Sequence, residues 1–242
     1  MKQKVLLLLA MVALLTLLVP AETVAGGGTK TTVYFLRHAE DSIELIQTGG
    51  SGTGSDPYTY MQRFVGTTAV RPLNVLGLQR AGLLGEWFEE QGIAGMLEYV
   101  VATQKVRTQQ TVQPIADEAG LAITQIPAGS EWAPSSISFA IAGQPTVDFV
   151  RNVPPGSDVV VANHSNNLYP MMQALGIDTS DPVKFPKDPT TGFVVGYNNL
   201  WIVKIDASGV GELDDHVLLD LVIDAAGEGK GLYQVRGFGH GN

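Results

Sequence analysis

Two arginines and two histidines could do chemistry, because each follows a stretch that reads as a buried strand. Arg37 and His38 end the segment YFLRH, Arg107 comes shortly after LEYVVAT, and His164 ends SDVVVANH. Guanidinium groups bind phosphate oxygens through paired, charge-assisted hydrogen bonds, and helix starts nearby add oriented backbone N–H groups. Taken singly, each residue is more often structural. Gathered at one edge of a sheet, they predict a phosphate site.

The elements that would position these residues alternate between strand and helix. Periodicity and turn residues predict strands over 31–36, 97–103, 121–127 and 157–163, helices over 77–92, 106–120, 145–152 and 166–176, and a closing hairpin over 199–224. Such alternation predicts one three-layer α/β/α domain with a mostly parallel central sheet. The carboxyl ends of parallel strands share one edge, where ligands bind.

Local signals mark where these elements end. Asn74 is predicted to cap the first helix, and an asparagine is predicted to cap the last one. Gly120 is predicted to end the second helix. Pro114 strains this second helix unless it lies in a first turn or a kink. The glycines of GGSGTGSD follow no strand and precede no Gly-Lys-Ser/Thr, so a mobile loop over 42–72 is a better interpretation than a phosphate loop. The Gly-rich last residues predict a loosely held tail.

Composition limits the partners. A net charge of −9 argues against a general polyanion-binding surface, so nucleic acid is not an expected partner and a phosphate needs a local cationic pocket. The lack of cysteine excludes disulfides, thiol catalysis and cysteine zinc sites. The 242 residues suit one domain or at most two small ones.

The first 25 residues have the three-part pattern of an export signal. Lys2 and Lys4 precede an apolar run over 5–19, and small residues offer cleavage sites after Ala25 or Ala21. The alternative is a retained anchor, but the run is short for a span of about 20 residues. Cleavage after Ala25 removes two lysines and one glutamate, changing the net charge from −9 to −10. We therefore expect a periplasmic or secreted protein, with residues 26–242 as its single domain and no stable membrane span.

Four motifs in order resemble the histidine phosphatase superfamily, whose fold is phosphoglycerate-mutase-like. FLRHAE resembles its Arg-His-Gly/Ala signature, LNVLGLQRAGLL its Leu-Thr-x-x-Gly-x-x-Gln/Arg-Ala stretch, VVATQKVRTQQTVQPIADEAGL its Ser-x-x-x-Arg-Thr block, and VVVANHSNNLYPMMQALG its second-histidine block. YNNLWIVKID is similar to a late strand of the same proteins. Ala39, Asn74 and Thr103 depart from the usual glycine, threonine and serine.

The resemblance implies a role for each residue. His38 would be the nucleophile that carries a phosphoryl group, and Arg37, Arg107 and His164 would bind the phosphoryl oxygens, with no metal or other cofactor required. A carboxyl group between the arginine block and the second histidine would protonate the leaving group. Glu131 has a suitable position, and burial against the adjacent Trp132 would raise its pKa as a general acid needs; a solvated loop carboxylate is the alternative.

Asp148 and the pair Glu40 and Asp41 are rivals for the general acid. The sequence as a whole predicts an exported phosphatase that acts on a small-molecule or peptide phosphomonoester. The alternatives are a mutase with the same residues and a non-catalytic phosphoryl-ligand binder on this fold. Insertions over 42–72 and near DPVKFPKDPTTGFVVG reshape the pocket rim and would select the substrate. The sequence gives no indication of oligomeric state.

Overall fold

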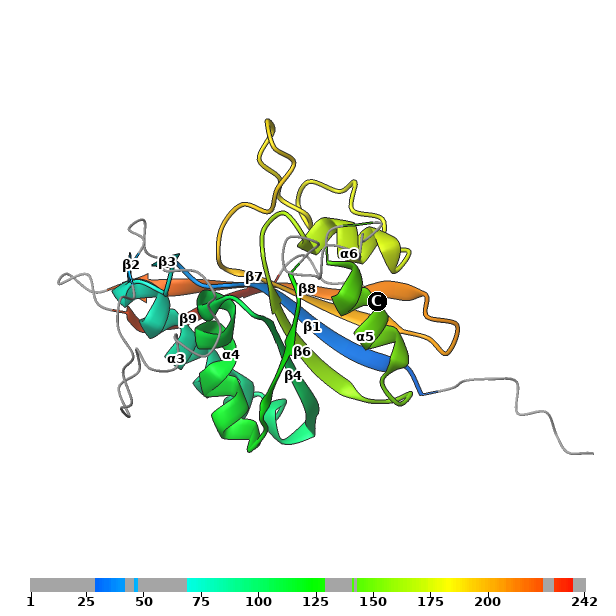
Figure 1. Cartoon of the computed structure of the whole chain (residues 1–242), viewed down its shortest axis with the longest axis horizontal. Coiled ribbons are helices and arrows are strands. Elements are labelled where there is room, and N and C mark those ends of the chain that lie inside the picture. Colours follow the sequence, from blue (N-terminus) through cyan, green and yellow to red (C-terminus); the bar gives the residue numbers. More distant parts are fainter. Residues whose placement is uncertain are drawn as a thin grey trace, which may run out of the picture.

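The central sheet is parallel in one half and antiparallel in the other. The computed structural model describes residues 29–41, 46–47, 69–128, 141, 143–223 and 229–236. Seven strands of these ranges form one sheet in the order β5-β4-β6-β1-β7-β8-β9, and β1 pairs in parallel with β6 but antiparallel with β7 (Figure 1). Their bounds are β1 (Thr31–Arg37), β4 (Leu97–Thr103), β5 (Ile123–Ile126), β6 (Asp158–Asn163), β7 (Asn199–Ile205), β8 (Gly211–Ile223) and β9 (Gly229–Arg236).

Helices cover both faces of this sheet, as predicted. The helices are α3 (Val75–Glu90), α4 (Val106–Ala119), α5 (Gln144–Asn152) and α6 (Leu168–Ala174), with a short 3₁₀ turn η1 (Ala94–Met96) before β4. Figure 1 shows α3 and α4 on one side of the sheet and α5 and α6 on the other. A separate ribbon pairs β2 (Ile46–Gln47) with β3 (Ala69–Val70). The predicted α/β/α fold with a largely parallel core is therefore confirmed.

The alternation of side chains along β1 explains its continuous apolar sequence. Val33 and Phe35 belong to the buried cluster that includes residues of α5 and α6, whereas Tyr34 and Leu36 belong to the cluster that includes residues of α3 and α4. A strand covered on both faces has no solvent side for polar residues. The charged residue of the strand, Arg37, lies at its carboxyl end.

Several local predictions are confirmed, and two are wrong. The Asn74 side chain accepts a hydrogen bond from Gly77 N at 2.8 Å, and Gly120 ends α4 in the left-handed conformation with φ of +66°. In contrast, Asn167 makes no side-chain cap of α6; its amide instead donates to Ala128 O and Asn163 Oδ1. The expected loose tail contains β9, which extends the hairpin of β7 and β8 by one strand.

Helix α4 continues through Pro114, which lies neither in its first turn nor at its end. The proline ring faces α3, since a Cβ added to Gly85 would lie 2.7 Å from Pro114 Cβ. The two helices therefore approach closely at this point.

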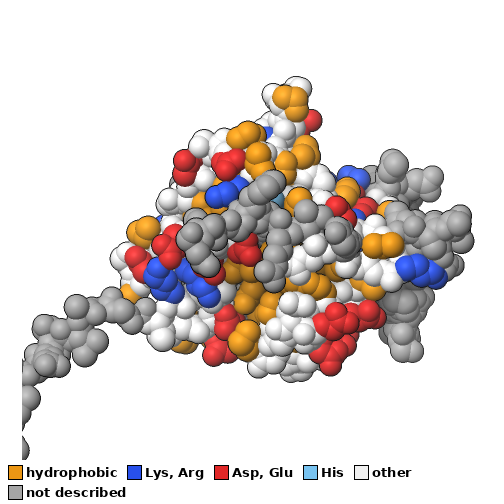
Figure 2. All heavy atoms as spheres, turned by 180° about the vertical axis from the view of Figure 1, so that it is seen from behind, with side chains coloured by type: hydrophobic (Ala, Val, Ile, Leu, Met, Phe, Trp, Pro, Cys, Tyr) orange, Lys and Arg blue, Asp and Glu red, His pale blue; other side chains and the backbone are white. Residues whose placement is uncertain are grey.

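The predicted export segment and most of the predicted loop over 42–72 lie outside the described residues. Within the described ranges, no helix is both long and apolar enough to cross a membrane. Figure 2 shows basic and acidic side chains in separate groups on the face viewed from behind, rather than one basic surface.

Candidate active site

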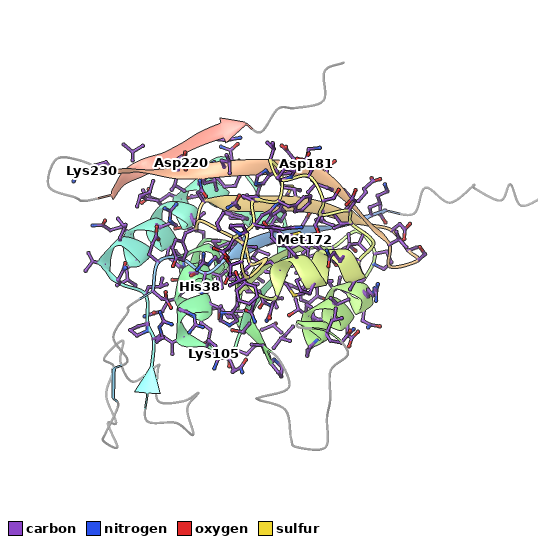
Figure 3. The ribbon with its side chains drawn as sticks, turned by 90° about the horizontal axis from the view of Figure 1, so that it is seen from above. His38, Lys105, Met172, Asp181, Asp220 and Lys230 are labelled. Atoms are coloured by element: carbon purple, nitrogen blue, oxygen red, sulfur yellow. The ribbon has the colours of Figure 1, made fainter. Side chains whose placement is uncertain are left out.

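The two arginines and two histidines meet at the carboxyl edge of the parallel strands. Arg37 is the last residue of β1 and pairs in register with Asn163, the last residue of β6; His38 and His164 are the next residues of the two strands. The two imidazole rings lie with their centroids 5.4 Å apart in an edge arrangement. Figure 3 shows His38 between the two groups of helices, near the middle of the molecule. The sheet topology thus produces the predicted gathering.

The tautomer of His38 follows from its two hydrogen bonds. Nδ1 lies 2.8 Å from Ala39 O, an acceptor, so Nδ1 carries the proton. Nε2 accepts a hydrogen bond from Arg107 Nε at 3.2 Å. Burial lowers the His38 pKa to about 3, with the positive charges of Arg107 and Arg37 acting in the same direction and the bond to Ala39 O opposing them. The imidazole is therefore neutral at pH 7, with the Nε2 lone pair facing the site.

His164 is held in the opposite tautomer by a chain of hydroxyl groups. Its Nε2 lies 3.0 Å from Thr103 Oγ1, which lies 2.8 Å from Thr108 Oγ1, and Thr108 in turn donates to Lys105 O at 2.7 Å. With the Thr108 proton committed to that carbonyl, Thr103 donates to Thr108 and accepts from His164 Nε2–H. Burial lowers the His164 pKa well below its usual value, and Arg107 adds to the effect. Nδ1 is left as an acceptor.

Arg107, in the first turn of α4, connects the two histidines. Its NH2 lies 3.3 Å from His164 Nδ1, while its Nε bonds His38 Nε2. The same Nε forms an ion pair with Asp41 Oδ2 at 3.6 Å. One guanidinium thus faces the lone pairs of both imidazoles, and a phosphoryl group that binds there would meet all three side chains.

Arg37 is held by a loop that sequence reasoning treated only as part of the rim. Its NH1 donates to Gly196 O at 3.1 Å and Val194 O at 3.4 Å, and its guanidinium carbon lies 4.0 Å from the centroid of the Tyr197 ring. The Tyr197 ring is also 6.0 Å from that of His38. Tyr197 is not among the predicted site residues, although it follows a glycine and begins the segment YNNLWIVKID.

Glu40 anchors the segment that follows His38. Its carboxylate accepts from Arg80 Nε at 3.0 Å and from Arg80 NH2 at 2.7 Å, and Arg80 NH1 donates to Leu219 O at 2.9 Å. The first turn of α3 presses against the same residue, since a Cβ on Gly77 would lie 2.1 Å from Glu40 O. Helix α3, strand β8 and the segment after His38 are therefore tied together through the pair of Glu40 and Arg80.

The alanine in place of the usual glycine after His38 is accommodated by packing. Ala39 is fully buried and packs with Leu73 and Ala81, and its backbone N–H donates to Thr111 Oγ1 of α4 at 2.9 Å. Its methyl group thus has its own apolar contacts, and the carbonyl is free to accept from His38 Nδ1.

Glu131, the predicted general acid, and its neighbour Trp132 lie outside the described residues. The described residues before them end at Ala128, whose N–H donates to Gln104 Oε1 at 2.8 Å and whose carbonyl accepts from Asn167 Nδ2 at 2.8 Å.

The rival carboxylates occupy different settings. Glu40 is committed to Arg80, and Asp148 is exposed on α5, where Gln144 Nε2 donates to it at 2.7 Å. Asp41 alone of these three contacts the site: it pairs with Arg107 and with Arg71, whose NH2 lies 3.1 Å from Asp41 Oδ2.

Comparison with known proteins finds a family model that matches part of the chain. Residues 33–138 match the family model described as the histidine phosphatase superfamily (branch 1); this range includes Arg37, His38 and Arg107 but stops before His164. No curated protein matches the chain.

Solved structures similar to this chain have low sequence identity. The protein histidine phosphatase SixA in complex with tungstate has a TM-score of 0.46 and 17% identity, covering 76% of this chain and 95% of that one. YhfR of Bacillus stearothermophilus has a TM-score of 0.47 and 18% identity, covering 76% of this chain and 95% of that one. Phosphoglycerate mutase of Plasmodium falciparum has a TM-score of 0.44 and 12% identity, covering 87% of this chain and 99% of that one.

Proposed function

We propose that this chain, whose residues 33–138 match the model of the histidine phosphatase superfamily, hydrolyses a phosphomonoester through a phosphohistidine at His38. The observation that carries this proposal is the Arg107 guanidinium between the acceptor nitrogens of two buried, neutral histidines. An imidazole nitrogen is a nucleophile only when it is unprotonated. The hydrogen bond from His38 Nδ1 to Ala39 O keeps the proton on Nδ1 and the lone pair on Nε2.

The proposed reaction has two displacements. In the first, His38 Nε2 attacks phosphorus, the bond from phosphorus to the ester oxygen breaks, and the alcohol leaves with a proton. In the second, water attacks the phosphohistidine, the phosphorus–nitrogen bond breaks, and orthophosphate leaves. Arg37, Arg107 and His164 bind the equatorial oxygens throughout and offset the negative charge that develops there.

The two alternatives differ in what they predict. A mutase would return the phosphoryl group to its intermediate instead of passing it to water. A non-catalytic binder would hold phosphate without forming a covalent intermediate, and the ready-made Nε2 lone pair of His38 favours an enzyme over such a binder.

The test is to trap the intermediate. Wild-type protein mixed with labelled phosphomonoester and quenched without acid should carry an acid-labile label, and it should turn over a generic aryl phosphate. His38→Asn should lose the label and at least about a thousandfold in turnover, since it removes the nucleophile. Phosphate binding without label in the wild type would favour the binder, and turnover retained in the variant would exclude His38 as nucleophile.

We propose Glu131 as the general acid, on the ground of its position between the arginine block and His164. An alkoxide must be protonated as it leaves, whereas a nitrophenolate need not be. Glu131→Gln should therefore slow single-turnover phosphorylation by an alkyl phosphate about a hundredfold or more, and by an aryl phosphate much less. Equal slowing of both would argue against this role, and Asp41→Asn is then the next variant to measure.

We also propose that residues 1–25 direct export. The support is the basic start, apolar middle and small-residue end of this segment. Sequencing the amino terminus of the protein from the producing cell should find a new start at Gly26; a protein that retains Met1 would contradict cleavage.

A further inference from the structure

Arg37 depends on one loop for its orientation, the segment 194–197 just before β7. This loop makes three contacts with the guanidinium. The carbonyls of Val194 and Gly196 accept hydrogen bonds from NH1, and the guanidinium carbon lies 4.0 Å from the centroid of the Tyr197 ring. Arg37 Nε is buried and has no hydrogen-bond partner among the described residues. Among the described residues, the hydrogen bonds of this guanidinium therefore come from one nitrogen, and Tyr197 covers one of its faces.

The loop itself is fixed to the sheet. Asn199 Nδ2 donates to Val195 O at 3.0 Å, and Asn199 Oδ1 lies 2.9 Å from His216 Nε2 of β8. On the other side, Val194 N donates to Ser165 O at 3.1 Å, one residue after His164. The loop is thus anchored at both the antiparallel strands and the second-histidine segment.

The turn before Tyr197 requires glycine. Gly196 has φ of +74°, and a Cβ there would lie 2.7 Å from Asn198 Oδ1. This left-handed residue lets one short segment present both its carbonyl and the following aromatic ring to the same guanidinium.

From these contacts we infer that Tyr197 is a positioning residue for phosphoryl binding, which acts through Arg37. Its ring supports one face of the guanidinium by a cation–π contact, so that the free donors stay directed at the phosphoryl oxygens. A guanidinium without that support would sample other rotamers, and ordering it on binding would weaken affinity. This inference rests on the proposed function, because it concerns the same phosphate site.

The decisive measurement is phosphate affinity rather than activity alone. We would measure competitive inhibition by orthovanadate and binding of inorganic phosphate by calorimetry for Tyr197→Leu, Tyr197→Phe and the wild type. The leucine variant should bind both anions about tenfold more weakly, as loss of a partly desolvated cation–π contact requires. The phenylalanine variant keeps the ring and should restore most of that loss.

A double-mutant cycle shows whether Tyr197 acts through Arg37. Arg37→Lys keeps the charge but removes the planar group that stacks on the ring. If the ring acts through the guanidinium, Tyr197→Leu should weaken anion binding less than about twofold in the Arg37→Lys background, because the two changes remove one shared interaction.

A matched control separates this effect from general loss of an aromatic residue. Tyr99 is a half-buried tyrosine of β4 that packs edge-on against Phe149, remote from the carboxyl end of the strand. Tyr99→Leu should leave vanadate inhibition unchanged. Melting temperatures are measured for all variants, and Tyr197→Gln takes the place of Tyr197→Leu should the latter fail to fold.

The outcomes are distinct. Unchanged affinity in Tyr197→Leu overturns the inference, as does full additivity with Arg37→Lys. Equal weakening by Tyr197→Phe and Tyr197→Leu also overturns it, since the hydroxyl rather than the ring would then contact the ligand. Among the outcomes of these binding measurements, only wild-type protein that binds neither vanadate nor phosphate contradicts the proposed function itself.

Discussion

At the scale of single residues, the two site histidines differ from ordinary histidines in staying neutral when the protein is folded. An unfolded chain binds protons at these positions as the pH falls below about 6.5, whereas folded His38 does so only near a pKa of about 3. Because the unfolded state then holds more protons, the free energy of unfolding falls as the pH decreases from 6.5 toward 3. Above pH 6.5 the two histidines do not make the free energy of unfolding depend on pH.

This dependence can be measured by denaturant unfolding between pH 7 and pH 4. We expect His38→Asn to lose stability less steeply on acidification, by about 1 kcal/mol per pH unit below pH 6, because one non-titrating residue replaces one buried imidazole. His216→Asn provides a comparison at a buried histidine outside the site, where the pKa is lowered by burial to a smaller extent. Identical slopes for wild type and His38→Asn would contradict the charge state assigned to His38.

The tautomer of His164 predicts that phosphate binding takes up a proton. Nε2–H is committed to Thr103, so Nδ1 can donate to a phosphoryl oxygen only after it is protonated. The groups facing this ring are Arg107, His38, Lys105 and Arg37, all cationic or neutral in the free protein, and a bound phosphate dianion reverses their effect. Calorimetry of phosphate binding at pH 7 in buffers of different ionisation enthalpy should find about one proton more taken up per site by the wild type than by His164→Asn, because the protonation change of phosphate itself is common to both. Equal proton uptake by the two proteins would show that His164 does not donate from Nδ1.

At the scale of elements, the close approach of α3 to the nucleophile segment is the most sensitive contact. Gly77→Ala would place a methyl carbon where the Glu40 carbonyl lies, and we expect a loss of about 2 kcal/mol in stability together with weaker vanadate binding. Gly82→Ala is the control in the same helix: a Cβ there meets nothing within 4 Å, and alanine favours a helix over glycine by about 1 kcal/mol. If Gly77→Ala and Gly82→Ala are equally stable, the close approach of α3 to Glu40 does not require glycine at position 77.

The elements also show what a sequence can predict. Runs such as VYFL and DVVVAN, alternating with helical periods, were sufficient for the layered sheet, and parallel topology then required Arg37, His38 and His164 to share an edge. Tyr197 could not be predicted, because its contact with Arg37 depends on a left-handed turn at Gly196 and on a loop whose path has no repeating pattern. The hydroxyl chain from His164 to Thr108 likewise depends on rotamers rather than on spacing.

The errors have physical causes of the same kind. The glycines before and within β9 suggested a loose tail, but pairing with β8 supplies hydrogen bonds that residue propensity does not include. Asn167 follows the usual preference for an N-cap, yet two carbonyl acceptors on other segments compete for its amide.

At the scale of the whole molecule, the antiparallel half of the sheet should matter for the site although it contributes no catalytic residue. A chain ending at residue 198 lacks β7, the antiparallel neighbour of β1, and should neither bind vanadate nor unfold cooperatively. A chain ending at residue 228 lacks only the edge strand β9 and should be less stable but retain binding. Binding in the shorter chain would show that β1 is held well enough by β6 alone.

The central place of β1 also determines when the site can exist during synthesis. The strand that ends at Arg37 is made first, but both of its neighbours in the sheet, β6 and β7, are made more than a hundred residues later. A ribosome therefore synthesises most of this chain before β1 has a strand on either side. Until then the proposed phosphate site cannot form.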